Sequence, residues 1–238
     1  MTRFQPKDQT AGRYRLPIER LGDHSDIHPD KPLHFYFEGV RYQGFEGDTL
    51  ASALMANGVK RLGRSFKLHR PRGLMTAGLE EPNALLQLAK GEAGDEPNAR
   101  ATTVALREGL SASGQNAWPS VNWDCFGVLG FFQRLLPASF YYKSMIWPSW
   151  HFYEGLVRKM AGLGTAPTQA DPDRYQHQHL HCEVLIVGGG PVGLSAALEQ
   201  GKQGKTVVLM DNQTQWGGSL LGTQQTIDGL PARQWVKQ

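Results

Sequence analysis

Residues 182–211 constrain the fold of this chain more than any other stretch, because they read CEVLIVGGGPVGLSAALEQGKQGKTVVLMD. The apolar run at 184–187 is too short for a free-standing helix and is β-branched enough for a buried parallel strand. Gly188, Gly190 and Gly193 then give the G-x-G-x-x-G spacing where that strand must turn into a helix. The stretch therefore predicts a strand, a glycine turn and a helix.

Each glycine of this turn has its own physical role. Gly188 permits the tight turn, the missing side chain at Gly190 lets a pyrophosphate approach the backbone, and Gly193 lets helix and strand pack closely. Free N–H groups at the helix start would face the phosphates. Pro191 has no N–H but fits the first helical turn, so Val192 is the better candidate for a direct amide contact.

A second apolar run at residues 207–209 predicts another strand, which ends near Asp211. A carboxylate at this point can accept hydrogen bonds from the ribose hydroxyls of an adenine dinucleotide, and it would repel a 2′-phosphate. A glycine-rich turn in an ordinary parallel sheet is the alternative explanation, but such a turn does not require the acidic residue. The pattern favours a dinucleotide site and leaves the choice between NAD and FAD open, because both present the same adenosine and pyrophosphate.

The chain has the composition of a globular protein, with 238 residues of which 40% are apolar. No stretch approaches the roughly 18 to 20 uncharged apolar residues of a membrane span, and the first residues lack the apolar segment of a secretion signal. We therefore expect a cytoplasmic protein without membrane contact. Two cysteines, Cys125 and Cys182, are too few for a disulfide framework or a sulfur-ligated metal site.

Positive charge is concentrated at residues 60–72, which carry six Lys and Arg residues and no acidic one. A solvated loop, a surface for an anionic partner or cofactor and a nucleic-acid contact all remain compatible with this run. Nucleic acid is the least favoured, because a net charge of +3 and a pI near 8.9 fall short of the footprint of a nucleic-acid-binding protein.

The N-terminal half predicts an extended arm at residues 1–30 and then a folded domain at 31–115. LHFYFEG and VRYQGFEG alternate as the two strands of a hairpin, and DTLASALMANG follows as a helix capped by Asp48 or Thr49. A further strand is expected around residues 102–106. This order resembles the β-grasp fold of two-iron two-sulfur ferredoxin domains.

The resemblance to ferredoxins concerns the fold and not the cluster. Where such ferredoxins carry a cysteine-rich loop after the helix, this sequence reads GRSFKLHRPRGLMTAG. Because this loop has no cysteine, thiolate ligation of a cluster is excluded there and an iron-free domain is expected.

Residues 116–178 form an aromatic-rich connector, which prolines keep from being one helix. Most of its rings are expected to cover the chain's own core, with contact to another subunit as the alternative. The run HQHLHC, which ends at Cys182, places three imidazoles on one face of an extended chain but the thiol on the other. A metal site is therefore not expected.

The dinucleotide-binding domain is predicted at residues 179–238. After Asp211 the sequence continues NQTQWGGSL, in which the glycine pair predicts a second flexible turn beside the nucleotide. Residues 228–231 read as the start of a helix that runs on as ARQWVKQ. Two strands cannot complete a parallel sheet, so we expect the domain to be incomplete at the C-terminus and the chain to be a fragment of a longer protein.

Five segments together resemble the α subunits of heterotetrameric sarcosine oxidases. They are PLHFYFEGVRYQGFEGDTLASALMANG, GRSFKLHRPRGLMTAGLEEPNALLQL, SFYYKSMIWPSW, VLIVGGGPVGL and DNQTQWGGSL. The resemblance implies a mixed α/β and α+β chain with a cluster-free ferredoxin-like domain and a Rossmann-like domain that holds NAD, with FAD as the alternative. It places the cofactor contacts on the turn, on the residues after Asp211 and on the second glycine turn: Gly188, Gly189, Gly190, Val192, Gly193, Asp211, Asn212, Gln213, Gly218 and Ser219.

The same resemblance implies β, γ and δ subunits as partners, with FAD and a covalent FMN on the β subunit, and a tetrahydrofolate domain beyond the present C-terminus. The implied reaction is oxidative demethylation of sarcosine to glycine, with formaldehyde or methylene-tetrahydrofolate and hydrogen peroxide as products. No catalytic residue is expected in this chain. An FAD-binding subunit of a related amine or opine dehydrogenase and a non-catalytic adaptor subunit are the alternatives.

Overall fold

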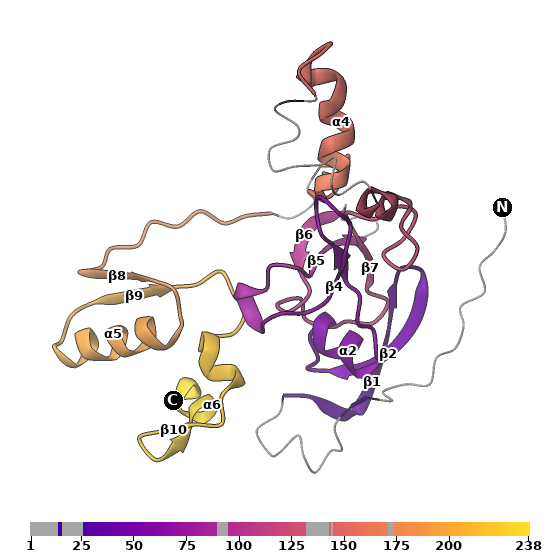
Figure 1. The fold of residues 1–238 in the computed structure, drawn as a ribbon. Coiled ribbons are helices and arrows are strands. Elements are labelled where there is room, and N and C mark those ends of the chain that lie inside the picture. The colour runs from indigo at the N-terminus through magenta and orange to yellow at the C-terminus, as the bar shows by residue number, and fades with distance from the viewer. Residues whose placement is uncertain (1–13, 16–25, 90–94, 132–142, 144, 171–173) are drawn as a thin grey trace. The chain divides into compact units, whose positions relative to one another are not determined.

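The computed structural model describes residues 14–15, 26–89, 95–131, 143, 145–170 and 174–238. The chain divides into two compact units, Met1–Asp173 and Arg174–Gln238. The first unit contains a five-stranded sheet and the second contains a pair of parallel strands joined by a helix (Figure 1).

The first unit starts with a hairpin of β1 (His28–Phe37) and β2 (Val40–Glu46), in which Phe37 lies opposite Val40. The turn residues Glu38 and Gly39 have φ angles of 52° and 74°. Two successive positive φ values are what a two-residue turn needs to match the right-handed twist of its strands. The predicted hairpin is confirmed, although β1 begins inside the segment expected to be an arm.

Helix α2 (Leu50–Ala56) begins where the sequence predicts, with Thr49 as its N-cap. Thr49 Oγ1 accepts a hydrogen bond from Ser52 N at 3.1 Å, and Ser52 Oγ accepts one from Thr49 N at 3.0 Å. This reciprocal pair satisfies two amides that the first turn leaves free. The helix buries Leu50 and Leu54 completely in one hydrophobic cluster with the strand residue Phe35.

The sheet is completed by β5 (Leu85–Ala89), β6 (Glu96–Arg100) and β7 (Ser111–Gly114), and its strand order is β2-β1-β7-β5-β6. β1 and β7 run parallel, whereas the other neighbouring strands are antiparallel. A chain-distant strand thus lies between the first hairpin and the β5–β6 pair, as Figure 1 shows.

The prediction of a strand around residues 102–106 is wrong. Carbonyl oxygens in and next to this segment accept hydrogen bonds from the first amides of helix α2 instead. Leu50 N donates to Val104 O and Ala51 N donates to Ala101 O, both at 2.8 Å. The segment therefore crosses the start of α2 and satisfies amides that have no partner inside the helix. Its contribution to sheet pairing is the single bridge between Ala105 and Thr49.

The described part of the first unit also contains four short elements and a longer helix. They are β3 (Gly63–Arg64), β4 (Pro71–Arg72), η1 (Gly78–Glu80), η3 (Cys125–Gly130) and α4 (Trp150–Ala161). β3 and β4 pair antiparallel, so the basic run forms a small hairpin.

The described rings of the aromatic connector are mostly exposed. Trp123, Phe131, Trp147 and Phe152 have exposed fractions of 71%, 88%, 83% and 73%. The prediction that most of these rings cover the core is therefore wrong for the described residues, because the core is filled by side chains from residues 33–112. Residues 132–142, which carry further rings of the expected subunit contact, lie outside the described residues.

The second unit contains β8 (Val184–Val187), α5 (Pro191–Lys202) and β9 (Val207–Met210). The strands are parallel, with Val184 opposite Val207 and Val187 opposite Met210. The predicted succession of strand, glycine turn, helix and strand is confirmed.

The end of the chain differs from the prediction. Asp228 and Gly229 do not begin a helix but form the turn between β10 (Thr226–Ile227) and β11 (Leu230–Pro231), with φ angles of 52° and 79°. An Asp-Gly pair favours this turn because both residues tolerate positive φ. The helix α6 (Ala232–Lys237) starts after the hairpin, and η5 (Gly218–Gly222) precedes it.

Candidate functional site

The candidate site lies where β8 and β9 end at the same edge of their parallel pair. Gly188 N donates to Met210 O at 2.7 Å, which continues the pairing by one residue beyond Val187. Gly188 has a φ of 109°, a conformation that favours glycine, so the chain can leave the strand abruptly at this residue. In parallel sheets flanked by helices, ligands bind outside this carboxyl edge.

Two glycines of the turn differ in the space around them, one being tightly packed and the other open. A Cβ atom at Gly193 would lie 1.9 Å from Gly188 O, so the close approach of helix and turn requires glycine. A Cβ atom at Gly190 would meet no atom within 4 Å. The side of the turn at Gly190 is therefore open to a ligand, whereas Gly193 is needed by the fold itself.

Helix α5 begins next to this open position. Gly190 is its N-cap and Pro191 its first residue. The amides of Val192 and Gly193 have no acceptor inside the helix, because the first turn lacks preceding carbonyls. The side chain of Val192 is 83% exposed, so it packs little against the unit. Free amides at a helix start attract anions.

Asp211 joins the two loops that follow β8 and β9. One oxygen of its carboxylate accepts a short hydrogen bond from Gly189 N, and Oδ1 accepts one from Gln213 N at 2.7 Å. These bonds, that from Gly189 first, lower the pKa of the Asp211 carboxyl below its ordinary value. Each carboxylate oxygen has a second lone pair, so the group can still accept a ribose hydroxyl.

The second glycine turn packs on the first. Gly217 N donates to Gly189 O at 2.7 Å, and a Cβ atom at Gly218 would lie 3.2 Å from Gly190 Cα. The φ angles of Gly217 and Gly218, 116° and 52°, place both in the region that favours glycine. Ser219 follows on the exposed surface of η5. The structure thus brings the two predicted turns together.

The remaining predicted residues are the exposed Asn212 and the half-buried Gln213, which form the start of the second loop. Gln213 Nε2 donates to Asn212 Oδ1 at 3.0 Å, so their carboxamides are linked. Sequence reasoning missed Trp216, whose ring atom Cε3 would lie 2.9 Å from a Cβ atom at Gly189. The aromatic residue directly before a glycine pair was the available signal.

The arrangement fits the diphosphate of an adenine dinucleotide. It offers an open glycine position, helix amides without intrahelical acceptors and a carboxylate beyond the second strand.

Within the part of the chain that the structure describes, no group of three or more His, Cys, Asp or Glu side chains could hold a metal ion. The described helices also include none that is long and apolar enough to cross a membrane.

The loop between α2 and β5 holds a second polar cluster. Arg64 Nε donates to Val121 O at 2.9 Å and Arg64 Nη1 donates to His69 O at 3.0 Å. His69 Nδ1 lies 2.8 Å from Asp124 Oδ2. Residues 30–117 contain no cysteine, so this donor set does not fit a thiolate-ligated iron–sulfur cluster.

Two family models match the chain. A 2Fe-2S iron-sulfur cluster binding domain matches residues 30–117, and an FAD binding domain matches residues 181–217. The chain therefore consists of a ferredoxin-like domain followed by the start of an FAD-binding domain, in a mixed α/β structure. The second match covers both glycine turns up to Gly217 and Asp211 between them.

Three curated relatives carry the name sarcosine oxidase subunit alpha. The protein of Rhizobium meliloti (strain 1021) is 48% identical over 227 residues, which are 94% of this chain and 22% of the relative. Those of Corynebacterium sp. strains U-96 and P-1 are 33% and 34% identical over 88% and 94% of this chain, and 17% and 19% of their own length. The resemblance predicted from the motifs is confirmed, and the chain matches an N-terminal portion that is about a fifth of the length of these relatives.

Among solved structures, the crystal structure of L-proline dehydrogenase from P. horikoshii is similar with a TM-score of 0.44 and 20% sequence identity. The similarity covers 87% of this chain and 30% of that chain.

Proposed function

We propose that this chain is the N-terminal part of an amine-oxidising flavoenzyme subunit of the sarcosine oxidase α type, and that its second unit binds an adenine dinucleotide. The observation that carries the dinucleotide site is the contrast between two glycines. A Cβ atom at Gly193 would lie 1.9 Å from Gly188 O, whereas a Cβ atom at Gly190 would meet no atom within 4 Å. The fold explains the first glycine, and an approaching diphosphate explains the second.

In the proposed complex the amides of Val192 and Gly193 donate to the pyrophosphate, and Asp211 accepts hydrogen bonds from the adenosine ribose. The other contacts come from the backbone of the two glycine turns and from the polar residues between them: Gly188, Gly189, Gly190, Asn212, Gln213, Gly218 and Ser219. The packing of Gly217 and Gly218 on Gly189 and Gly190 supports a single site made by both turns.

The comparisons bear differently on the two candidate cofactors. The model that matches residues 181–217 describes FAD-binding domains, so it supports FAD. NAD, which the resemblance to sarcosine oxidases implies, has no support from that match. Because both cofactors share the adenosine diphosphate, the geometry around Gly190 and Asp211 serves either one.

The activity belongs to the longer protein. We propose oxidation of the CH–NH bond of sarcosine to an imine. Hydrolysis of this imine gives glycine and formaldehyde, whereas transfer of its one-carbon unit to tetrahydrofolate gives glycine and methylene-tetrahydrofolate. A bound flavin would supply the redox chemistry, taking up two electrons from the amine and passing them to oxygen to give hydrogen peroxide. The name subunit alpha of the relatives supports assembly with other subunits, for which we propose β, γ and δ chains. The β chain would carry FAD and FMN, and a further domain of the α chain would bind tetrahydrofolate.

A related FAD-dependent amine or opine dehydrogenase subunit is the second candidate, and the FAD-type match favours it.

The proposed domains are residues 31–115 and 179–238, with 116–178 as the connector. The bonds of Arg64 to Val121 and of His69 to Asp124 argue that the first part of the connector packs with the first domain.

The test compares two substitutions in the complete enzyme isolated with its subunits. Gly190→Val should remove the nucleotide, because the new side chain fills the open approach to the turn. Gly201→Val is the matched control, because a Cβ atom there also meets nothing within 4 Å and lies elsewhere on α5. Mass spectrometry of the nucleotides released on denaturation identifies the cofactor. Unchanged nucleotide content in the Gly190 variant would refute the site.

A further inference from the structure

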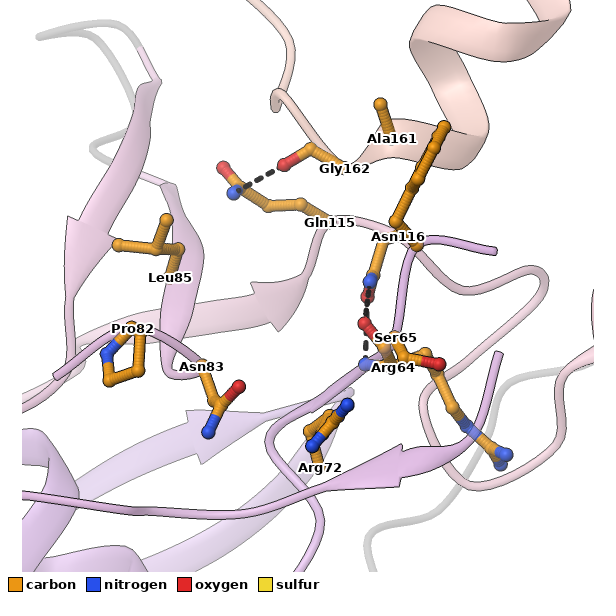
Figure 2. A pocket seen from close by; sticks show the side chains of 11 residues that line it. Arg64, Ser65, Arg72, Pro82, Asn83, Leu85, Gln115, Asn116, Ala161 and Gly162 are labelled. Carbon is orange, nitrogen blue, oxygen red and sulfur yellow. Dashed lines mark hydrogen bonds between the residues drawn. The ribbon is translucent and has the colours of Figure 1, made fainter. Parts of the chain in front are cut away.

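We propose that a polar pocket in the first unit binds a small organic carboxylate with a short apolar body. The cavity has a volume of about 270 Å³. It lies between the β3–β4 hairpin, the start of β5 and the segment after α4 (Figure 2), and all of its lining residues belong to the first unit. Nothing in the proposed function of the second unit requires it.

The charge of the pocket is positive. Arg72 lines it, and among the described residues its guanidinium has no hydrogen-bond acceptor or ion-pair partner. Arg64 also lines it but directs its guanidinium to the carbonyls of Val121 and His69. No Asp or Glu is among the lining residues. A guanidinium without a partner offers a planar pair of donors that matches a carboxylate.

Neutral donors stand beside this cation. The side-chain amide of Asn83 has no partner among the described residues. Ser65 Oγ accepts from Arg70 N at 2.9 Å, which leaves its hydroxyl hydrogen to donate. Figure 2 shows Asn83, Arg72 and Ser65 around the opening, with Gln115 and Gly162 across from them. Three kinds of donor thus converge on one cavity.

The walls of the pocket are held before any ligand binds. Asn116 pairs with the backbone of Arg64, accepting from its N at 3.0 Å and donating to its O. Gln115 Nε2 donates to Gly162 O at 3.1 Å, which fixes the segment after α4. Asn83 N donates to the buried Glu81 carboxylate at 2.7 Å. A preformed site avoids part of the entropy lost on binding.

The apolar part of the lining narrows the ligand class. Phe66, Pro82 and Leu85 offer an apolar wall, which an inorganic anion such as phosphate cannot use. Because no carboxylate lines the cavity and Arg72 is positive, the ammonium group of an amino acid would meet a like charge and no counter-ion there. We therefore expect sarcosine and glycine not to bind, and the pocket fits an anion that carries a carboxylate and no amine.

Benzoate is the probe for this class, titrated into the whole 238-residue chain and followed by amide NMR shifts and calorimetry. We expect saturable binding with shifts at Ser65, Asn83 and Asn116. Arg72 is an exposed residue, so Arg72→Gln should lower the association constant about threefold to fivefold, as expected for the loss of an exposed charge-assisted pair. Arg107→Gln removes the same charge from an exposed residue outside the lining and should leave binding unchanged.

Benzamide, inorganic phosphate and glycine complete the test. Benzamide has the same shape without the charge, so it should not bind, and neither phosphate nor glycine should compete with benzoate. Absence of benzoate binding, equal binding of benzamide, or equal weakening by Arg72→Gln and Arg107→Gln would overturn the proposal. Preferential binding of phosphate or glycine would overturn the ligand class. Amide spectra of both variants, recorded first, confirm that each retains the fold.

Discussion

His69 Nδ1 lies 2.8 Å from Asp124 Oδ2, and both side chains are fully buried. The other carboxylate oxygen of Asp124 accepts from Trp118 N at 3.1 Å and from Phe126 N at 3.2 Å. The pair therefore joins the loop after α2 to the segment after β7. Where an iron–sulfur ferredoxin would use thiolates in this loop, a buried imidazole–carboxylate pair and Arg64 hold it here.

Asp124→Ala should destabilise the first unit strongly, because it leaves the buried imidazole of His69 and two amides without their acceptor. Removing one partner of a buried polar pair costs about 3–5 kcal/mol. Glu46→Ala is the control, since its ion pair with Lys31 is about half exposed, at 50% and 52%, and such pairs contribute little to stability. Urea unfolding followed by NMR signals of the first unit measures both. Equal loss in the two variants would show that Asp124 does not secure the loop.

Gly193→Ala should disrupt the junction of β8 and α5, because the new methyl group would overlap Gly188 O. Overpacking of this kind costs about 1–3 kcal/mol. Gly201→Ala, in the same helix with nothing within 4 Å of its Cβ position, should instead stabilise by up to about 1 kcal/mol. Thermal unfolding of the second unit compares them. A neutral Gly193→Ala would contradict the close packing of turn and helix.

The sequence predicted those elements whose signals are local. The hairpin at Glu38-Gly39, the capped helix from Leu50 and the glycine turn at Gly188 each carry their own turn or cap residues, and all three are found. For the candidate site, the G-x-G-x-x-G spacing and Asp211 indicated the two loops that the structure brings together.

Long-range pairing could not be read in the same way. Residues 102–106 have strand-like composition, but the free amides at the start of α2 donate hydrogen bonds to carbonyl oxygens of this region. Whether these carbonyls pair with a strand or with the helix start depends on the three-dimensional fold. The contact of His69 with Asp124 spans 55 positions and has no local signal. The turn at Asp228-Gly229 was readable, because this pair favours two positive φ values.

Asp211→Asn should loosen the contact between the two glycine turns, because an amide side chain replaces one acceptor oxygen with a donor. The folded-state pKa of Asp211 is lowered, so its contribution to stability is present above the ordinary aspartate pKa of about 3.9 and is lost as pH falls through the folded value. The difference in melting temperature between parent and variant should therefore shrink below about pH 4.

Glu199→Gln on the exposed surface of α5 is the control for Asp211→Asn and should melt like the parent. The complete enzyme with Asp211→Ala should in addition bind its nucleotide more weakly, as calorimetry can measure. Unchanged affinity would remove Asp211 from the proposed site, while a melting difference independent of pH would show that its carboxylate does not hold the turns.

The ferredoxin-like unit should contain no iron–sulfur cluster, because residues 30–117 lack thiolate ligands. We expect iron below stoichiometric amounts and no cluster absorbance in the chain prepared without oxygen and supplied with iron and sulfide. A known iron–sulfur ferredoxin treated in parallel shows that the conditions allow assembly. Stoichiometric iron in this chain would contradict the prediction and would require ligands other than cysteines of this unit.

Glu38→Gln should change how stability depends on pH. Glu38 accepts from Gly114 N at 2.6 Å and from Val121 N at 3.3 Å, and burial raises the pKa of its carboxyl above the ordinary value. A raised folded-state pKa contributes stability that is fully present below about pH 4.3 and is lost as pH rises through the folded value. The glutamine side chain stays neutral at every pH. The unfolding free energy of the Glu38→Gln variant relative to that of the parent should therefore rise between about pH 4 and pH 7.

Urea unfolding of the first unit across this pH range measures the effect of Glu38→Gln. Glu80→Gln, at an exposed position of η1, should leave the pH profile of the parent unchanged. If the Glu38 variant keeps a constant difference from the parent at every pH, the carboxyl does not titrate with folding. In that case its role is confined to accepting the amides of Gly114 and Val121, which join the first hairpin to β7 and to the segment that follows it.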